Sequence, residues 1–263
     1  MITGFTIDSR RVSPGDLFFA VRGERFDGHD FAADALDKGA AGVIVADTSV
    51  AVSDTKGQTT PIMIVVGDTT EALQLLARFI RRRSGTRVVA ITGSVGKTTT
   101  KELTAAFIST RYRVFRNEGN LNNHIGLPLS LLELRHRPEV AVVEFGMSHA
   151  GEIRKLVRIA EPEVRVWTNV AQVHAAFFES IEAIADAKAE ILEEATTRTQ
   201  LVANAADSRV MSRIGGFVGK VSTFGVDTEA DVCATCIRNL GLAGTESSVR
   251  TPGRAGVLRT SLL

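Results

Sequence analysis

The sequence of 263 residues contains few cysteines, no marked excess of either charge and no long apolar run. Two cysteines are too few for a disulfide scaffold and suit a reducing cytoplasm. Lys and Arg number 31 against 30 Asp and Glu, so the formal net charge is +1, and no general attraction to nucleic acid or to an anionic membrane is expected. No apolar run approaches the ~20 residues of a membrane-spanning helix, and the N-terminus lacks the basic and apolar segments of a signal peptide. We therefore expect a cytoplasmic protein that binds neither nucleic acid nor membrane.

What is present is an ordinary globular mixture, with 44% hydrophobic and 23% charged residues. From the N-terminus to about residue 84, short apolar runs predict strands at 5–8, 17–21, 42–45 and 62–66, with helices at 31–38 and 69–83. The second helix ends in three arginines, Ser84 and Gly85, which we interpret as a solvated helix end and a domain boundary rather than a nucleic-acid patch. The predicted domains are therefore residues 1–84 and 85–263.

Strands and helices alternate in the second domain. Strands are predicted at 88–92, 140–144, 164–168 and 200–204, with helices at 97–109, 127–134, 151–159 and 181–194. This alternation predicts βαβ units, hence an α/β fold with a mostly parallel sheet covered by helices on both faces. After about residue 221 the pattern changes to short strands with glycine turns.

The most informative segment, residues 88–102, has the sequence VVAITGSVGKTTTKE. A buried strand leads into a glycine-containing loop and then a helix, which points backbone N–H groups at an anion. Lys97 would reach the outer phosphates and the Thr98 hydroxyl would bind Mg²⁺. Ile91 stands where the longer form of this motif has a glycine. A purely structural turn would leave the lysine and threonines unexplained, so we predict that residues Gly93, Ser94, Val95, Gly96, Lys97, Thr98 and Thr99 bind ATP.

Two further residues follow strands at the same predicted edge of the sheet. Glu144 ends the strand at 140–144, where carboxylates face the ligand crevice, and is a candidate metal ligand. The alternative is a strand-end charge that simply reaches water. His174 follows the strand at 164–168; alone, it would more often be a packed or surface histidine, and its position at this edge is what favours a functional role.

Lys188 is out of place on its helix. The apolar stripe of residues 181–194 includes Ile184, Ala185 and Ile191, and Lys188 falls in the middle of it. The acidic residues of the helix are predicted on the opposite face: Glu182, Asp186, Glu190, Glu193 and Glu194. A buried ammonium is costly, so this lysine should be paired, neutral or modified, unless its stem carries the amine out to water.

Cys233 and Cys236 have the spacing of a metal or redox pair, but there is no second pair. Residues 231–238 are predicted to form a strand, in which residues three apart point to opposite faces. We expect no metal or redox role for these cysteines.

Four motifs carry a resemblance to a known family. They are DSRRVSPGDLF at 8–18, GERFDGHDF at 23–31, GNLNNHIGLP at 119–128 and EFGMSHAGEI at 144–153. Together with the phosphate loop they resemble the Mur ligases, the ATP-dependent amide-forming enzymes of bacterial cell-wall synthesis. The last two motifs favour the members that add D-alanyl-D-alanine to UDP-N-acetylmuramoyl-tripeptide.

The resemblance implies roles for individual residues. Thr98 and Glu144 would hold one Mg²⁺ and His174 a second, although Ala175 and Ala176 replace the residues that often follow this histidine. Lys188 matches the lysine that the family carbamylates with CO₂, which would turn a buried cation into a metal-binding anion. The substrate candidates, from the first and third motifs, are Ser9, Arg10, Asn122 and Asn123. The expected protein is a monomer, with catalytic residues Lys97, Glu144, His174 and Lys188.

Only the first two of the family's three domains are resembled, namely a small UDP-substrate domain and an ATPase domain. We expect a fragment that lacks the C-terminal domain, and three hypotheses stay open. The first hypothesis is the D-alanyl-D-alanine-adding ligase. The second is a non-catalytic module that binds UDP-sugar peptide and ATP. The third is another member of the family, such as the tripeptide-forming or the folate polyglutamate ligase. The motif at 8–31 argues against the folate enzyme.

Overall fold

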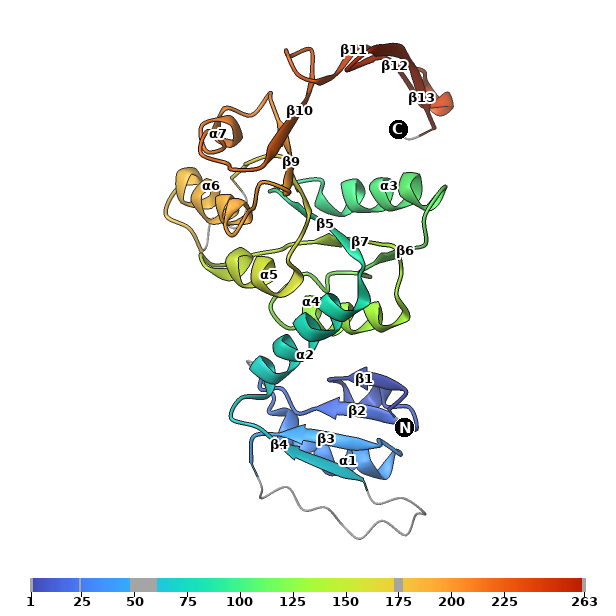
Figure 1. Cartoon of the computed structure of the whole chain (residues 1–263), viewed down its shortest axis with the longest axis vertical. Coiled ribbons are helices and arrows are strands. Elements are labelled where there is room, and N and C mark those ends of the chain that lie inside the picture. Colours follow the sequence, from blue (N-terminus) through green and yellow to red (C-terminus); the bar gives the residue numbers. More distant parts are fainter. Residues whose placement is uncertain (1, 24, 48–60, 173–176, 262–263) are drawn as a thin grey trace. The chain divides into compact units, whose positions relative to one another are not determined.

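The computed structural model describes residues 2–23, 25–47, 61–172 and 177–261. Contacts divide the chain into two compact units: Met1–Gly85 with Glu118–Arg137, and Thr86–Asn117 with Pro138–Leu263. Each unit has its own sheet (Figure 1). Among the described residues, no helix is long and apolar enough to span a membrane.

The first unit is built on a four-stranded parallel sheet in the order β1-β2-β3-β4. The strands are β1 (Gly4–Thr6), β2 (Asp16–Phe19), β3 (Gly42–Val45) and β4 (Ile62–Val65). Short 3₁₀ turns at Ser9–Arg11 and Gly28–Phe31 and the helix α1 (Ala32–Asp37) complete the connections. The predicted strands are confirmed to within one or two residues at each end.

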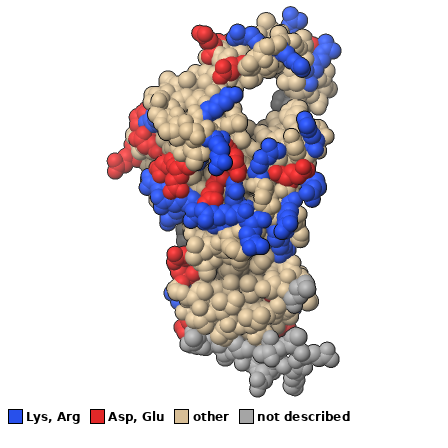
Figure 2. Space-filling view, viewed as in Figure 1, with Lys and Arg blue, Asp and Glu red and all other residues tan. Residues whose placement is uncertain are grey.

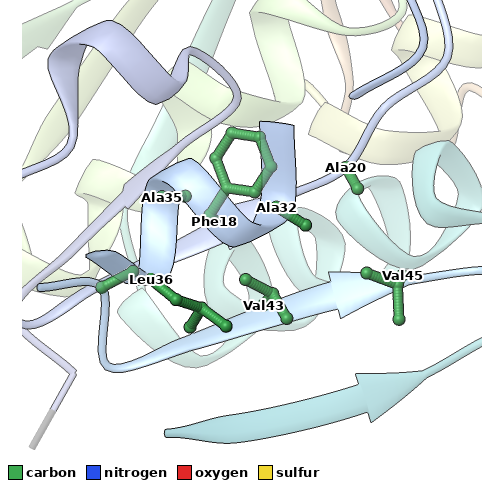
Figure 3. Packing of buried hydrophobic residues seen from close by; sticks show 8 residues of the cluster. Phe18, Ala20, Ala32, Ala35, Leu36, Val43 and Val45 are labelled. Atoms are coloured by element: carbon green, nitrogen blue, oxygen red, sulfur yellow. The ribbon is translucent and has the colours of Figure 1, made fainter. Parts of the chain in front are cut away.

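The core of the first unit lies between α1 and the middle strands. Phe18 is fully buried among small side chains of α1 and the valines of β3, as Figure 3 shows. Ala32 and Ala35 face the sheet with no side chain beyond Cβ, so the short helix can lie close to the strands. This apolar packing explains why a helix of only six residues is held in place.

Helix α2 (Thr69–Ser84) begins at Asp68, whose carboxylate accepts from the N–H groups of Thr70 (2.7 Å) and Glu71 (2.9 Å). It ends at Gly85, with a φ of +70°, as the sequence predicts. Arg81 is buried rather than solvated, because it continues the stripe of Leu73 and Ala77.

Residues 118–137 belong to the first unit, although the alternating pattern assigned them to the second. They form α4 (Gly126–Leu131) and a 3₁₀ turn at Leu132–His136, and both pack on α2. Gln74 of α2 also donates to the carbonyl of His124 (2.8 Å). The chain therefore leaves the second unit after Asn117 and returns at Pro138.

The second unit contains a nine-stranded sheet in the order β13-β12-β11-β10-β9-β8-β5-β7-β6. Its strands are β5 (Arg87–Thr92), β6 (Val114–Arg116), β7 (Val140–Glu144), β8 (Val164–Trp167), β9 (Gln200–Asn204), β10 (Lys220–Val226), β11 (Val232–Asn239), β12 (Thr245–Thr251) and β13 (Arg254–Thr260). From β6 to β11 every pairing is parallel, and β12 and β13 add an antiparallel ribbon. The predicted α/β fold with a mostly parallel sheet is confirmed.

Helices cover both faces of this sheet, as predicted. The helices are α3 (Lys97–Ser109), α5 (Glu152–Ala160), α6 (Ile181–Ala189), continued by a 3₁₀ turn at Glu190–Leu192, and α7 (Ser208–Met211). Ile91 and Val142 pack with Ala105 of α3 on one face. Arg165 alternates to the other face, where its guanidinium donates to the carbonyls of Ile191 and Glu193.

The cysteines lie in β11. Cys233 is buried and Cys236 is exposed. The alternation is not regular there, because Cys236 has a φ of +52° and the pairing with β12 shifts between Thr235 and Arg238. In the described ranges, no group of three or more His, Cys, Asp or Glu side chains gathers as a metal site would.

Candidate functional site

The order of the strands places the site at the C-terminal end of β5. From β5 the chain crosses through α3 to β6 and β7 on one side, and then through α5 to β8 on the other. Ligands of open parallel sheets bind at such a switch point, where the loops after neighbouring strands diverge. The loop after β5, Glu144 at the end of β7 and the loop after β8 all meet there.

The loop after β5 depends on two glycines. Gly93 has a φ of +155°, and a Cβ at this position would collide with Oγ1 of Thr168 and lie 3.2 Å from the backbone N of Asn169. Gly96 has a φ of +79° and starts α3, with open space around it. The first N–H groups of a helix have no intrahelical acceptor, so this turn presents donors and the positive end of the α3 dipole to an anion.

Hydrogen bonds join this loop to residues 168–171 after β8. The amide of Asn169 bonds Val95 twice, since Oδ1 accepts from its N–H (2.9 Å) and Nδ2 donates to its carbonyl (3.0 Å). The hydroxyl of Ser94 donates to the carbonyl of Ala171 (3.0 Å) and accepts from its N–H (2.9 Å). Thr168 Oγ1 adds a bond to the Val95 carbonyl (3.2 Å). Residues 94–95 and 168–171 are therefore tied together by five hydrogen bonds.

Lys97, Thr98 and Glu144 lie together at this edge. The Thr98 hydroxyl donates to Oε2 of Glu144 at 2.7 Å, although the two residues are 46 positions apart. Glu144 is 3% exposed, and its buried carboxylate faces Thr98 rather than bulk water, so the strand-end alternative is wrong. Lys97 is half-buried, and its Nζ donates to the Ser94 carbonyl (3.3 Å). The predicted juxtaposition is present, and the roles of these residues stay predictions.

Lys188 of α6 is 2% exposed, as its place in the apolar stripe predicts, and its amine does not reach water. Its Nζ donates to the carbonyl of Gly93 (3.0 Å), which brings it to the base of the phosphate loop. Burial and the neighbouring ammonium of Lys97 lower the pKa of Lys188 to about 7. Burial of Lys188 therefore favours its neutral amine.

One prediction for the same helix is wrong. Glu190 is not on the solvent face but is 6% exposed. Its Oε1 accepts from the N–H of Gly151 (2.6 Å) and its Oε2 from that of Arg154 (3.0 Å), so it satisfies donors at the start of α5. The helical period could not show this, because α6 has given way to a 3₁₀ turn at this residue.

The other acidic residues of 181–194 face outward, as predicted. They pair with arginines of α5 and of the α7 segment, in the pairs Arg154–Glu193 (2.6 Å), Arg158–Glu194 (2.6 Å), Arg209–Glu182 (2.7 Å) and Arg213–Asp186 (2.8 Å). Acidic and basic side chains are likewise interspersed on the face shown in Figure 2. Each of these arginine charges is thus balanced by a neighbouring carboxylate.

The variant Glu190→Gln tests the buried cap. A glutamine has one acceptor oxygen, so one of the two N–H groups of α5 would face an amide N–H, and we expect the free energy of unfolding to fall by about 1–3 kcal/mol. Glu193→Gln is the control, because its exposed pair with Arg154 is worth at most about 1 kcal/mol. Urea unfolding of both variants measures the difference, and equal losses would contradict a capping role for Glu190.

The remaining candidates lie elsewhere. His174 is outside the described residues, so its role stays a prediction. Ser9 is buried, whereas Arg10 is exposed and its guanidinium bonds Asp8 (2.8 and 2.9 Å), which lowers the pKa of that carboxyl to about 2. Asn122 is half-buried, and Oδ1 of Asn123 accepts from the N–H of Gly126 (2.8 Å) at the start of α4. These four residues belong to the first unit.

Sequence reasoning missed Asn169. The available signal is its position two residues past β8, on the edge that already carries Gly93 and Glu144. That edge was recognised, but an asparagine there does not reveal that its amide will bond another loop instead of a ligand.

Comparison with protein families agrees with this geometry. Residues 91–263 match the Mur ligase middle domain, and residues 1–81 match the Mur ligase family, catalytic domain. The chain belongs to the Mur ligase family. The predicted resemblance is thereby confirmed, and the middle-domain match contains the phosphate loop, Glu144 and Lys188.

Individual Mur ligases are similar over most of this chain. UDP-N-acetylmuramoyl-tripeptide–D-alanyl-D-alanine ligase of Bacillus subtilis is 44% identical over 192 residues, which are 73% of this chain and 41% of that protein. The structure of MurF from Acinetobacter baumannii is 32% identical, with a TM-score of 0.89 over 99% of this chain and 56% of that one. MurF ligase from Thermotoga maritima, solved in complex with ADP, is 30% identical with a TM-score of 0.85 over 97% of this chain and 57% of that one. The chain thus spans about half the length of these Mur ligases.

Proposed function

We propose that this chain supplies the nucleotide site and the UDP-substrate site of a ligase that adds D-alanyl-D-alanine to UDP-N-acetylmuramoyl-tripeptide with ATP. The observation that carries the proposal is the phosphate loop at the switch point, with Thr98 bonded to the buried Glu144 (2.7 Å) and Lys97 beside them. The names of the similar proteins supply the substrates. Monomeric state and cytoplasmic location stay predictions.

The proposed reaction has two steps. The terminal carboxylate of the tripeptide attacks the γ-phosphorus of ATP. The bond between that phosphorus and the β-γ bridging oxygen breaks, ADP departs, and an acyl phosphate is formed. The amine of D-alanyl-D-alanine then attacks the acyl carbon, phosphate departs, and the nitrogen loses a proton to give the amide. Phosphoryl transfer asks a protein mainly for position and for compensation of charge. Lys97 and the first N–H groups of α3 would supply both.

The residues present fit Mg²⁺. Hydroxyl and carboxylate oxygens are its preferred protein ligands. Thr98 Oγ1 and Glu144 Oε2 supply one of each, 2.7 Å apart. We propose that these two residues hold the cation, which when bound neutralises charge on the phosphates. His174 is proposed for a second cation.

We also propose that Lys188 is carbamylated. The neutral amine attacks the carbon of CO₂, a C–N bond forms, and a proton is released. Burial of Lys188 favours the neutral amine that this reaction needs, and the ammonium of Lys97 lies close enough to lower the pKa of Lys188, so it would favour the anionic product. The carbamate oxygens would provide metal ligands that a lysine lacks.

Ser9, Arg10, Asn122 and Asn123 are proposed to bind the UDP-sugar peptide.

Phosphate release is the experiment that tests the function. The chain is assayed with ATP, Mg²⁺, UDP-N-acetylmuramoyl-tripeptide and D-alanyl-D-alanine, and each component is omitted in turn. Release that needs all four is the expected result for the ligase. Binding of ATP and of UDP-N-acetylmuramoyl-tripeptide without release of phosphate would instead favour a binding module. Absence of binding to either compound would overturn the proposal.

Lys97→Met tests the nucleotide site. Removing the ammonium is expected to weaken ATP binding about 10-fold to 100-fold, as loss of a charge-assisted hydrogen bond does, and to reduce any turnover about 100-fold or more. Lys155→Met is the control, because Lys155 is an exposed lysine of α5. Calorimetric titration with ATP provides the affinities, and an unchanged affinity in Lys97→Met would exclude Lys97 from the site.

A further inference from the structure

Lys101 is a buried cation that the phosphate loop does not explain. It lies on α3, one turn after Lys97, and is 1% exposed. Its Nζ donates to the carbonyl of Asn117 at 2.5 Å and lies 3.1 Å from Oε1 of Glu102. Burying an ammonium is unfavourable unless its hydrogen bonds are well placed. This lysine therefore holds the main chain at Asn117 with a charged donor.

Asn117 stands where the chain leaves the second unit. The pairing of β6 with β7 ends at Arg116 and Val142. Past that pair, the side chain of Asn117 continues the ladder, because its Oδ1 accepts from the backbone N–H of Glu144 (3.1 Å). Asn117 is 1% exposed. A side-chain oxygen thus replaces the carbonyl that another strand residue would offer, while its own carbonyl is bonded to Lys101.

These bonds form a chain that ends at the candidate metal site. Lys101 fixes the backbone of Asn117, the Asn117 side chain fixes the backbone of Glu144, and the Glu144 carboxylate accepts from Thr98 (2.7 Å). At the outer end, Glu102 also pairs with Arg116 (2.9 Å). Residues behind a metal ligand set its orientation, and their loss commonly costs 10-fold to 100-fold in metal affinity.

We propose that Lys101 and Asn117 are positioning residues that hold the Glu144 carboxylate against Thr98 and thereby set the affinity of the nucleotide site for its divalent cation. The proposal rests on the function proposed above. It assigns neither residue a contact with nucleotide, so it predicts that they act on metal-dependent binding alone.

Calorimetry of ATP binding, once in excess EDTA and once in excess Mg²⁺, separates an effect on the metal from an effect on direct nucleotide contacts. The ratio of the two affinities is the metal enhancement. For Asn117→Ala, we expect this enhancement to fall about 10-fold, with the affinity in EDTA within about 2-fold of the wild type. For Lys101→Met we expect the same result, namely a lower metal enhancement and an affinity in EDTA close to that of the wild type. Asn117→Asp keeps an acceptor for the Glu144 N–H and should retain the wild-type enhancement or exceed it.

The controls distinguish the possible failures. Lys155→Met, at an exposed position, should leave both affinities unchanged, and thermal unfolding checks that each variant is folded. If Lys101→Met does not fold, the comparison of Asn117→Ala with Asn117→Asp decides alone. Equal losses in EDTA and Mg²⁺, or an unchanged enhancement, would overturn the positioning role. A wild-type chain that binds no ATP would instead overturn the proposed function, and this inference with it.

Discussion

Gly93→Ala is expected to abolish nucleotide binding and to lower the free energy of unfolding by about 3 kcal/mol or more. The new Cβ would collide with Oγ1 of Thr168 and approach Asn169 N to 3.2 Å, and overpacking of this kind costs about 1–3 kcal/mol. The φ of +155° adds backbone strain of about 1–3 kcal/mol. Relief requires the loop after β5 to move away from the loop after β8, which breaks the bonds between Asn169 and Val95.

Two other glycines separate crowding from strain. Gly96 has a φ of +79° but open space around it, so Gly96→Ala should cost only the left-handed strain of about 1–2 kcal/mol. Gly215 lies in the same unit, with no positive φ and no atom within 4 Å of an added Cβ, and Gly215→Ala should be nearly neutral. Urea unfolding and ATP titration rank the three variants. A Gly93→Ala chain as stable as Gly96→Ala would show that the loops are not packed as described.

The parts of the fold that depend on local pattern were predictable from sequence. The helix at 97–109 and the strands at 42–45, 140–144 and 200–204 coincide with the observed elements. Each strand is a short apolar run, and the helix begins directly after Gly96. The phosphate loop was found for the same reason, since a strand, a glycine turn and a helix are contiguous in the chain.

What escaped prediction depends on partners distant in sequence. Glu190 and Asn169 each satisfy backbone groups of a segment 36 to 74 positions away, and nothing adjacent to them in sequence signals this. Residues 118–137 form the predicted helix, but an apolar helix face does not say which sheet or helix it will cover. Lys188 is the instructive exception, because a cation in an apolar stripe announces its burial even though its partner, the Gly93 carbonyl, does not.

Lys188→Met is expected to remove catalysis while making the chain more stable. Methionine keeps the apolar stem and removes a buried amine whose charge is costly to desolvate, so the free energy of unfolding should rise, offset in part by loss of the bond to the Gly93 carbonyl. The same variant cannot form a carbamate, so turnover should fall about 100-fold or more, and a short carboxylic acid in the buffer should restore part of it. Thermal unfolding in CO₂-free buffer at pH 7 measures the change in stability. In NMR spectra, ¹³C-labelled bicarbonate should give a carbamate resonance in the wild type only. A fully active Lys188→Met would contradict the carbamate.

The pH dependence of stability provides an independent check on Lys188. Its pKa is lowered from 10.5 to about 7 in the folded chain. Below pH 7 both states carry the charge, and the cost of burying it is fully present. Between pH 7 and 10.5 the unfolded state binds more protons, so the free energy of unfolding contributed by this group rises with pH. Urea unfolding of wild type and Lys188→Met at pH 7, 8 and 9 should therefore show a stability advantage of the variant that shrinks as pH rises. A constant difference would mean that the pKa of Lys188 is not lowered in the folded chain, and it would contradict the burial cost assigned to this amine.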